Sequence, residues 1–190
     1  MSSLERYRDS KALVEDAGQL GEPSDDVRAK LEGSGVPLFT LFLSLQKGKE
    51  VAMADWNEAT IQEFHSKAGK GVGPFGDHLM LLTTVGARSG EERISPVMFH
   101  RDGERYVVVA SKAGAPDHPG WYHNLKANPV AKVEVGAKNG TETFEVRAHE
   151  AEGEERKRMY AERVAIAPGF GEYERKTSRK IPVMILERIG

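Results

Sequence analysis

Residues that could hold an anion gather between Gly86 and Arg93, where the chain reads GARSGEER. Glycines on both sides of a small-residue tip allow backbone amides to approach a ligand closely. Arg88 and Arg93 offer fork-shaped donors, and Ser89 adds a hydroxyl. The segment therefore favours a binding site for phosphate or carboxylate, although an ordinary hairpin with surface arginines has the same composition.

A second such segment, ASKAGAPD, runs from Ala110 to Asp117. A strand-like run of three valines ends in Ser111 and Lys112, and a loop through Gly114 then leads to an expected helix start. A lysine beside a helix N-terminus suits anion binding. The alternative is a loop lysine that is only solvated.

The third segment, DHPGWYHNL, follows directly and contains Trp121, Asn124 and Leu125. An indole at this place could stack on a ring system. It could equally be the large anchor of a core-facing helix stripe together with Leu125, and core is the usual role of one aromatic residue at helical spacing.

Other chemical patterns in the chain are weaker. The GxGxxG spelling at residues 71–76 follows an expected helix and precedes a strand, the reverse of a dinucleotide-binding fingerprint, so it indicates a connector. Of six histidines only His118 and His123 are close, at a spacing that does not share a helix face, and no metal site is predicted. Arg156 to Arg158 are flanked by glutamates and are interpreted as a solvated helix face.

The elements that must position these segments are mainly strands. Helices are expected over residues 55–68, 117–128 and 152–164, and the stretch before the last strand is expected to be a loop. Asp102-Gly103 and Asn139-Gly140 predict type I′ hairpin turns. A run of antiparallel strands with few helices between them hides its edges best by closing on itself, which predicts an α+β fold with a β-barrel. The expected strands are residues 79–85, 94–100, 105–110, 131–137, 141–148 and 181–188.

Composition limits the location and the partners of the protein. The 190 residues contain no cysteine and carry a formal net charge of −2, which excludes disulfides and gives no chain-wide field for nucleic acid. No secretory signal is evident, and a cytoplasmic location is expected. Residues 1–52 are interpreted as an N-terminal helical extension or leader, and residues 53–190 as the main domain. The apolar run 36–45 is too short to cross a bilayer and favours a docked helix, with peripheral contact to membrane or a partner as the alternative.

Taken together, three ordered motifs carry a resemblance. LLTTVGARSGEERISP, VVVASKAGAPDHPGWYHNLKANP and TSRKIPVMIL occur in this order. The chain from about Trp56 to Arg188 resembles the deazaflavin-dependent nitroreductase family, also called the quinone reductases that depend on coenzyme F420. The resemblance implies the split β-barrel of flavin-binding reductases, with flanking helices.

The resemblance also implies residue roles. The phosphate and the start of the polyglutamate tail would be held by Arg88, Ser89, Arg93 and Lys112. The deazaflavin ring would be lined by Ala110, Ser111 and Gly114, while Trp121 and Asn124 would pack along the cofactor.

The implied reaction is hydride transfer from reduced F420 to a small electron-poor acceptor such as a quinone, an enone or a nitroaromatic compound. Tyr173 is the first candidate for the proton donor, and Ser111 acting through water is the second. The stretch 167–173 keeps only Tyr173 where the best-known nitroreductase of the family has several tyrosines, and Phe170 stands in place of one hydroxyl. The alternatives are an FMN-dependent barrel enzyme and a non-catalytic deazaflavin-binding protein. A monomer is slightly favoured.

Overall fold

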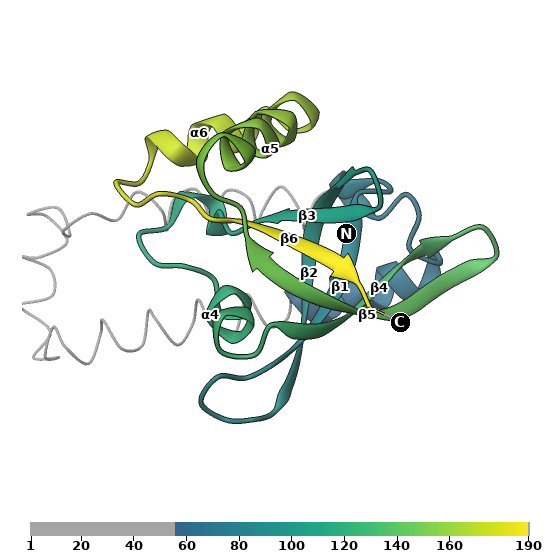
Figure 1. Cartoon of the computed structure of the whole chain (residues 1–190). Coiled ribbons are helices and arrows are strands. Elements are labelled where there is room, and N and C mark those ends of the chain that lie inside the picture. The colour runs from purple at the N-terminus through teal and green to yellow at the C-terminus, as the bar shows by residue number, and fades with distance from the viewer. Residues whose placement is uncertain (1–55, 190) are drawn as a thin grey trace, which may run out of the picture. The chain divides into compact units, whose positions relative to one another are not determined.

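A computed structural model describes residues 56–189 of the chain (Figure 1). Residues 56–66 are helical. The elements that follow are η1 (Gly73–Phe75), β1 (Leu79–Val85), β2 (Glu92–Asp102), β3 (Arg105–Val109), η2 (Lys112–Gly114), α4 (Gly120–Ala127), β4 (Val130–Ala137), β5 (Gly140–Glu150), α5 (Gly153–Ile166), α6 (Gly169–Arg175) and β6 (Val183–Arg188).

The six strands form one closed antiparallel barrel in the order β1-β2-β3-β6-β5-β4. The hairpin β1–β2 pairs Val85 with Glu92, and β1 closes the barrel by pairing Thr83 with Lys132 of β4. The last strand, β6, lies between β3 and β5. Closure leaves no open edge strand in the sheet, and the predicted α+β barrel is confirmed.

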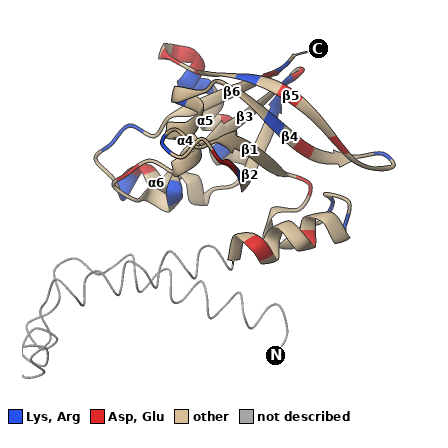
Figure 2. Cartoon of the chain, turned by 90° about the horizontal axis from the view of Figure 1, so that it is seen from below, with Lys and Arg blue, Asp and Glu red and all other residues tan. Residues whose placement is uncertain are grey.

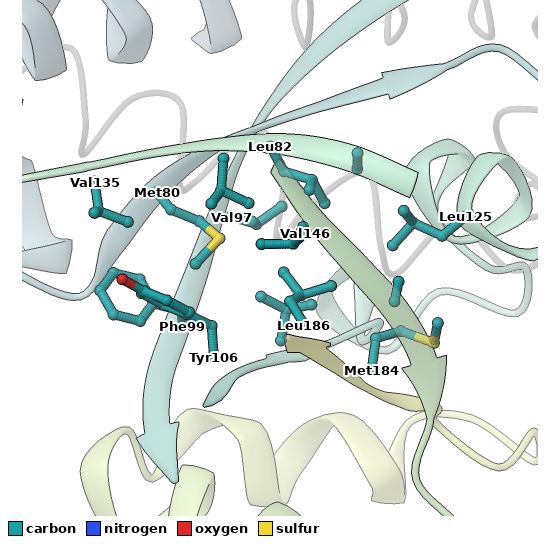
Figure 3. Close-up of a cluster of buried hydrophobic side chains, with 14 of the residues drawn as sticks. Met80, Leu82, Val97, Phe99, Tyr106, Leu125, Val135, Val146, Met184 and Leu186 are labelled. Carbon is teal, nitrogen blue, oxygen red and sulfur yellow. The ribbon is translucent and has the colours of Figure 1, made fainter. Parts of the chain in front are cut away.

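The barrel interior is filled by side chains from alternate positions of every strand (Figure 3). Figure 3 shows Met80, Leu82, Val97, Tyr106 and Leu186 among these side chains. Because side chains alternate between the two faces of a strand, each strand supplies the interior with every second residue. The interior is therefore a packed core.

Two further apolar layers cover the outside of the barrel. α5 and α6 pack on the outer faces of β3 and β6, so these two strands are buried on both sides. This explains why β3 and β6 are almost continuously apolar, in contrast to the alternation in β5. The outer face of β1 packs against Phe64, which lies in the helix at residues 56–66, and against Val72, which follows this helix.

Some local predictions were wrong. The stretch Gly169–Arg175, expected to be a loop, is the helix α6. Both predicted hairpin turns are displaced by one residue, because Asp102 pairs with Arg105 and Ala137 pairs with Gly140. The residues between the pairs are therefore 103–104 and 138–139.

Arg156 also differs from its interpretation as part of a solvated face. Its guanidinium is buried and donates to the Ile181 carbonyl, with Nη2 at 2.8 Å, and to Glu174 at 2.6 Å. Lys157 and Arg158 are exposed, as expected. The 71–76 segment is the predicted helix-to-strand connector and contains η1.

Charges of both signs are interspersed along β4, β5 and α6 (Figure 2), an arrangement typical of a solvated surface. Within residues 56–189, the structure has no helix long and apolar enough to cross a membrane. The N-terminal extension and the apolar run 36–45 lie outside the described residues, so those interpretations, and the boundary at residue 53, stay predictions.

Candidate active site

The loop between β1 and β2 is tightly folded by its own backbone. Gly86 N–H donates to the Glu91 carbonyl at 2.8 Å, and Gly90 N–H donates to the Gly86 carbonyl at 2.9 Å. A side chain at Gly86 would place its Cβ 2.5 Å from Ser89 Oγ, so glycine is needed for Ser89 to fold back. Ser89 Oγ accepts from Glu91 N–H at 3.3 Å, which leaves its proton available to a ligand.

The two arginines of this loop are exposed. Arg93 Nη2 binds Glu91 at 3.1 Å, and both side chains are more than half exposed. Arg88, at the tip, makes no ion pair within residues 56–189. A guanidinium that is exposed and without a protein partner can meet an anion from solvent at little desolvation cost.

Helix α4 fixes the position of this loop. Asn124 is buried, and its Oδ1 accepts from Ala87 N–H at 3.0 Å while its Nδ2 donates to Thr84 Oγ1 at 3.0 Å. The Asn124 amide therefore ties α4 to the β1–β2 hairpin. Trp121 is partly buried and packs against the barrel core beside Leu125, as the core-anchor alternative predicts.

The loop from Ala110 to His118 has an unusual backbone. Lys112, Ala113 and Gly114 all have positive φ, at 47°, 53° and 83°. For Lys112 and Ala113 this left-handed conformation is disfavoured, and it persists only where the surroundings impose it. Such clusters are typical of functional loops.

Gly114 allows this loop to touch helix α6. A Cβ at Gly114 would lie 2.9 Å from Lys176 Cβ and 3.0 Å from the Tyr173 carbonyl oxygen. No side chain fits in that space. The sequence-predicted residues Gly114 and Tyr173 are thus brought together through their backbones.

Lys112 forms an ion pair with Asp117 across the same loop. The hydrogen bond from Lys112 is the main reason that the pKa of Asp117 lies below its usual value. Both side chains are exposed, so the ammonium remains accessible to solvent. Ala110 and Ser111 are buried beside it, and Ser111 Oγ makes no hydrogen bond within residues 56–189.

Arg179 holds this loop in place and was not singled out by sequence reasoning. Its guanidinium donates to the carbonyls of Ala110, Ser111 and Ala115, and to His118 Nδ1. These partners are mostly main-chain atoms, which leave no mark in a sequence. The only sequence signal was its place in the TSRKIPVMIL motif.

Tyr173 lies in α6, with its ring packed against Phe170 at a centroid distance of 5.2 Å. Its side chain borders the apolar cluster between the barrel and α5. Its hydroxyl lies beside Gly169, at the start of the same helix. The structure thus positions the Tyr173 backbone over the 110–118 loop, and the role of the hydroxyl stays a prediction.

These segments gather at one end of the barrel. Figure 1 shows the β1–β2 loop, α4, η2 and α6 in succession along this end. The two basic loops share no hydrogen bond or ion pair within residues 56–189. They are joined by α4, whose start continues the 110–118 loop and whose Asn124 binds the β1–β2 loop. Helix α4 therefore joins the loop that carries Arg88 and Arg93 to the loop that carries Lys112.

Comparisons with known proteins identify the family. The model of the F420H2-dependent quinone reductase family matches residues 56–188, nearly all of the described chain. A relative named F420H2-dependent quinone reductase, from Mycobacterium tuberculosis, is 40% identical over 110 residues, which cover 57% of this chain and 72% of the relative. A second, putative, F420H2-dependent quinone reductase of the same species is 33% identical over 107 residues, 56% of this chain and 87% of the relative.

Solved structures agree with this family. A structure described as an F420-H2 dependent reductase is 42% identical, with a TM-score of 0.51, and the match covers 58% of this chain and 94% of that one. A chain described as a domain-swapped dimer is 39% identical, with a TM-score of 0.53, and the match covers 70% of this chain and 98% of the other. The resemblance of the three motifs is confirmed, and it favours F420 over the FMN alternative. The chain belongs to the F420H2-dependent quinone reductase family and is an F420-dependent oxidoreductase built on a split β-barrel.

Proposed function

We propose that Arg88, Arg93 and Lys112 bind the anionic tail of F420 at this end of the barrel, and that the ring then meets a small electron-poor acceptor, of which a quinone is the first candidate. The observation that carries the proposal is the pair of basic loops joined by α4, with Arg88 free of protein ion pairs within residues 56–189. The quinone is favoured because the relatives are named as quinone reductases.

The chemistry of the site fits such a cofactor. Phosphate and carboxylate oxygens accept short, charge-assisted hydrogen bonds from guanidinium and ammonium groups. Ser89 and the amides of the glycine-bracketed loop add neutral donors. When bound, F420 supplies the hydride. The protein contributes binding, orientation and the exclusion of water from the ring.

A proton must also reach the reduced acceptor. Tyr173 and Ser111 are the proposed sources, because both belong to the segments that meet at Gly114. Ser111 Oγ has no partner within residues 56–189, so it can hold a water against a ligand. Replacing Tyr173 with phenylalanine, and Ser111 with alanine, should lower kcat with little change in F420 affinity. Full turnover in both variants would assign the proton to solvent.

The decisive experiment is the double replacement Arg88→Ala with Lys112→Ala. Each charge-assisted hydrogen bond contributes about 1.5–3 kcal/mol, so the Kd for F420 should rise at least about 100-fold. Fluorescence titration of F420 measures this, and unfolding in urea tests that the barrel is intact. Arg188→Ala, on β6, is the matched control and should leave Kd unchanged. Unchanged Kd in the double variant would refute the proposed site.

The acceptor is identified by turnover. Reoxidation of reduced F420 is followed with menadione, cyclohexenone and a nitroimidazole. We expect the highest kcat/KM with menadione and the lowest with the nitroimidazole, since Phe170 stands in place of one hydroxyl of the best-known nitroreductase of the family. Faster turnover of the nitroimidazole would contradict this order.

The monomeric state also remains a proposal. A related chain is described as a domain-swapped dimer, so light scattering of the whole chain decides between the two. The proposed cytoplasmic location rests on the sequence alone.

A further inference from the structure

We propose that Arg179 is a positioning residue for F420 binding, which sets the conformation of the 110–118 loop and acts on the cofactor only through it. The inference rests on the proposed function, since it takes this loop as part of the F420 site. Arg179 belongs to the segment just before β6, more than sixty residues away in the sequence from the loop that it holds.

The guanidinium is directed at one loop by four hydrogen bonds. Nε donates to the Ala115 carbonyl at 2.8 Å, and Nη2 donates to the carbonyls of Ala110 at 3.2 Å and Ser111 at 2.7 Å. Nη1 donates to His118 Nδ1 at 2.9 Å. Both ends of the loop are thus fixed to one rigid, planar group.

The acceptors flank the disfavoured part of the backbone. Ala110 and Ser111 precede the three residues with positive φ, and Ala115 follows them. Around these three residues the loop's own bonds are short-range, from Gly114 N–H to the Ser111 carbonyl and from Ala115 N–H to the Lys112 carbonyl, while Ala110 N–H donates to the Pro182 carbonyl at 2.9 Å. Because a left-handed lysine and alanine need outside support, the fork of Arg179 is the group that holds Lys112 where it can meet an anion.

Arg179 also fixes the form of His118. An N–H donated to Nδ1 requires that this nitrogen be unprotonated, so the neutral imidazole carries its proton on Nε2. Burial and the charge of Arg179 lower the pKa of His118, and the facing groups His123, Glu150 and Asp117 act on the same ring. His118 further contacts the Tyr122 ring of α4 at a centroid distance of 4.7 Å. The fork thereby orients the entry to α4 as well.

Arginine is required for this arrangement. A lysine carries a single ammonium group on a flexible stem, so it cannot reach all four acceptors that lie around the guanidinium of Arg179. The conservative replacement Arg179→Lys therefore keeps the charge but loses the fork, which separates positioning from simple attraction of the anionic cofactor.

The test compares Arg179→Lys and Arg179→Gln with Arg188→Lys, a matched replacement on β6. We expect both Arg179 variants to raise the Kd for F420 about 10-fold or more, with a smaller change in KM for menadione. Hydrogen exchange should become faster at the amides of Gly114 and Ala115 and stay unchanged in β5. Arg188→Lys should match the parent in every measurement.

The outcomes are distinguishable. If Arg179→Lys binds F420 as tightly as the parent, or if exchange rises equally throughout the barrel, the inference is overturned. If the double variant with Arg88→Ala and Lys112→Ala binds F420 as tightly as the parent, the proposed F420 site fails, whatever the Arg179 variants show. The inference is supported if both Arg179 variants bind F420 more weakly than the parent and hydrogen exchange becomes faster only in the 110–118 loop.

Discussion

The ion pair between Lys112 and Asp117 places a competitor beside the proposed anion site. Asp117 is ionised at neutral pH, as any ordinary aspartate is, and the hydrogen bond from Lys112 lowers its pKa further. Any anion that binds Lys112 must share the ammonium with this carboxylate. The pair is exposed, so it is weak, and the competition is correspondingly modest.

Replacing Asp117 with asparagine should therefore tighten F420 binding. An exposed ion pair contributes about 0.2–1 kcal/mol, which corresponds to a Kd lower by about 1.4- to five-fold. Fluorescence titration measures the change, and Glu104→Gln, in the exposed β2–β3 turn, is the control. Weaker binding in the Asp117 variant would mean that the carboxylate positions Lys112 instead of competing for it.

Gly114 allows a prediction about stability. Its φ of 83° and the 2.9 Å approach to Lys176 Cβ both exclude a side chain. Gly114→Ala should lower the free energy of unfolding by about 2–3 kcal/mol, from backbone strain together with displacement of α6. Gly103→Ala is the control, because Gly103 has φ of 62° with open space around it and should lose about 1 kcal/mol. Equal losses in urea unfolding would show that contact with α6 adds nothing.

For single residues, the sequence indicated which residue types could bind a ligand, but it did not indicate their hydrogen-bond partners. Lys112 and Gly114 could be selected as candidates because a basic residue and a glycine between a strand and a helix suggest anion binding. Asn124 was expected to pack along the cofactor, which stays a prediction; that its amide also binds Thr84 and the Ala87 N–H could not be read from the sequence. Arg179 was missed because carbonyl acceptors belong to every residue type.

At the scale of elements, α4 connects the two basic loops, because it follows the 110–118 loop in the chain and its Asn124 binds the β1–β2 loop. Asn124→Ala would leave the buried Thr84 hydroxyl and the Ala87 N–H without their partner. We expect a loss of about 1–3 kcal/mol in unfolding free energy and weaker F420 binding. Asn128→Ala is the matched control, since among residues 56–189 its side-chain amide makes a single exposed contact, at 3.5 Å, to the Val85 carbonyl. Unchanged F420 affinity in Asn124→Ala would show that the β1–β2 loop keeps its shape without α4.

All six strands could be predicted, because alternation and turn residues are local signals. Helix α6 could not, because two of its first three residues are glycines, which disfavour a helix. Tertiary contacts override this preference: Phe170 is buried among α5 and the outer barrel face, and its carbonyl accepts from Tyr160 Oη at 2.8 Å.

Across the whole molecule, a chain of charged groups fastens α5 to the β2–β3 hairpin. Arg158 binds Asp102 at 2.9 Å and Glu162 at 2.8 Å, and Asp102 in turn pairs with Arg105. Behind this surface, Arg163 is fully buried and its Nη2 lies 3.1 Å from His100 Nδ1. The guanidinium also lies over the Phe170 ring, with Cζ 5.4 Å from the ring centroid. A neutral His100 is therefore part of the packing between α5 and the barrel.

This buried pair makes global stability depend on pH. Burial, followed by the charge of Arg163, lowers the pKa of His100 from 6.5 to about 4. The unfolded chain consequently binds a proton at His100 more readily than the folded protein does. The contribution of neutral His100 to the free energy of unfolding is therefore complete above pH 6.5 and is lost as the pH falls toward 4. The shift corresponds to a loss of at most about 3.4 kcal/mol. His118 acts in the same direction, so the parent alone cannot isolate His100.

His100→Gln isolates the contribution of His100. Glutamine can accept the same hydrogen bond from Arg163 through its oxygen but does not titrate. We expect the parent to lose more unfolding free energy than the variant between pH 7 and pH 4.5, measured by urea unfolding at fixed ionic strength. The variant should retain only the smaller dependence due to His118 and the carboxylates. The reason for this expectation is that a buried imidazole which gains a charge beside Arg163 must weaken the packing of α5 on the barrel. If the two proteins lose unfolding free energy in parallel over this range, protonation of His100 does not govern that packing.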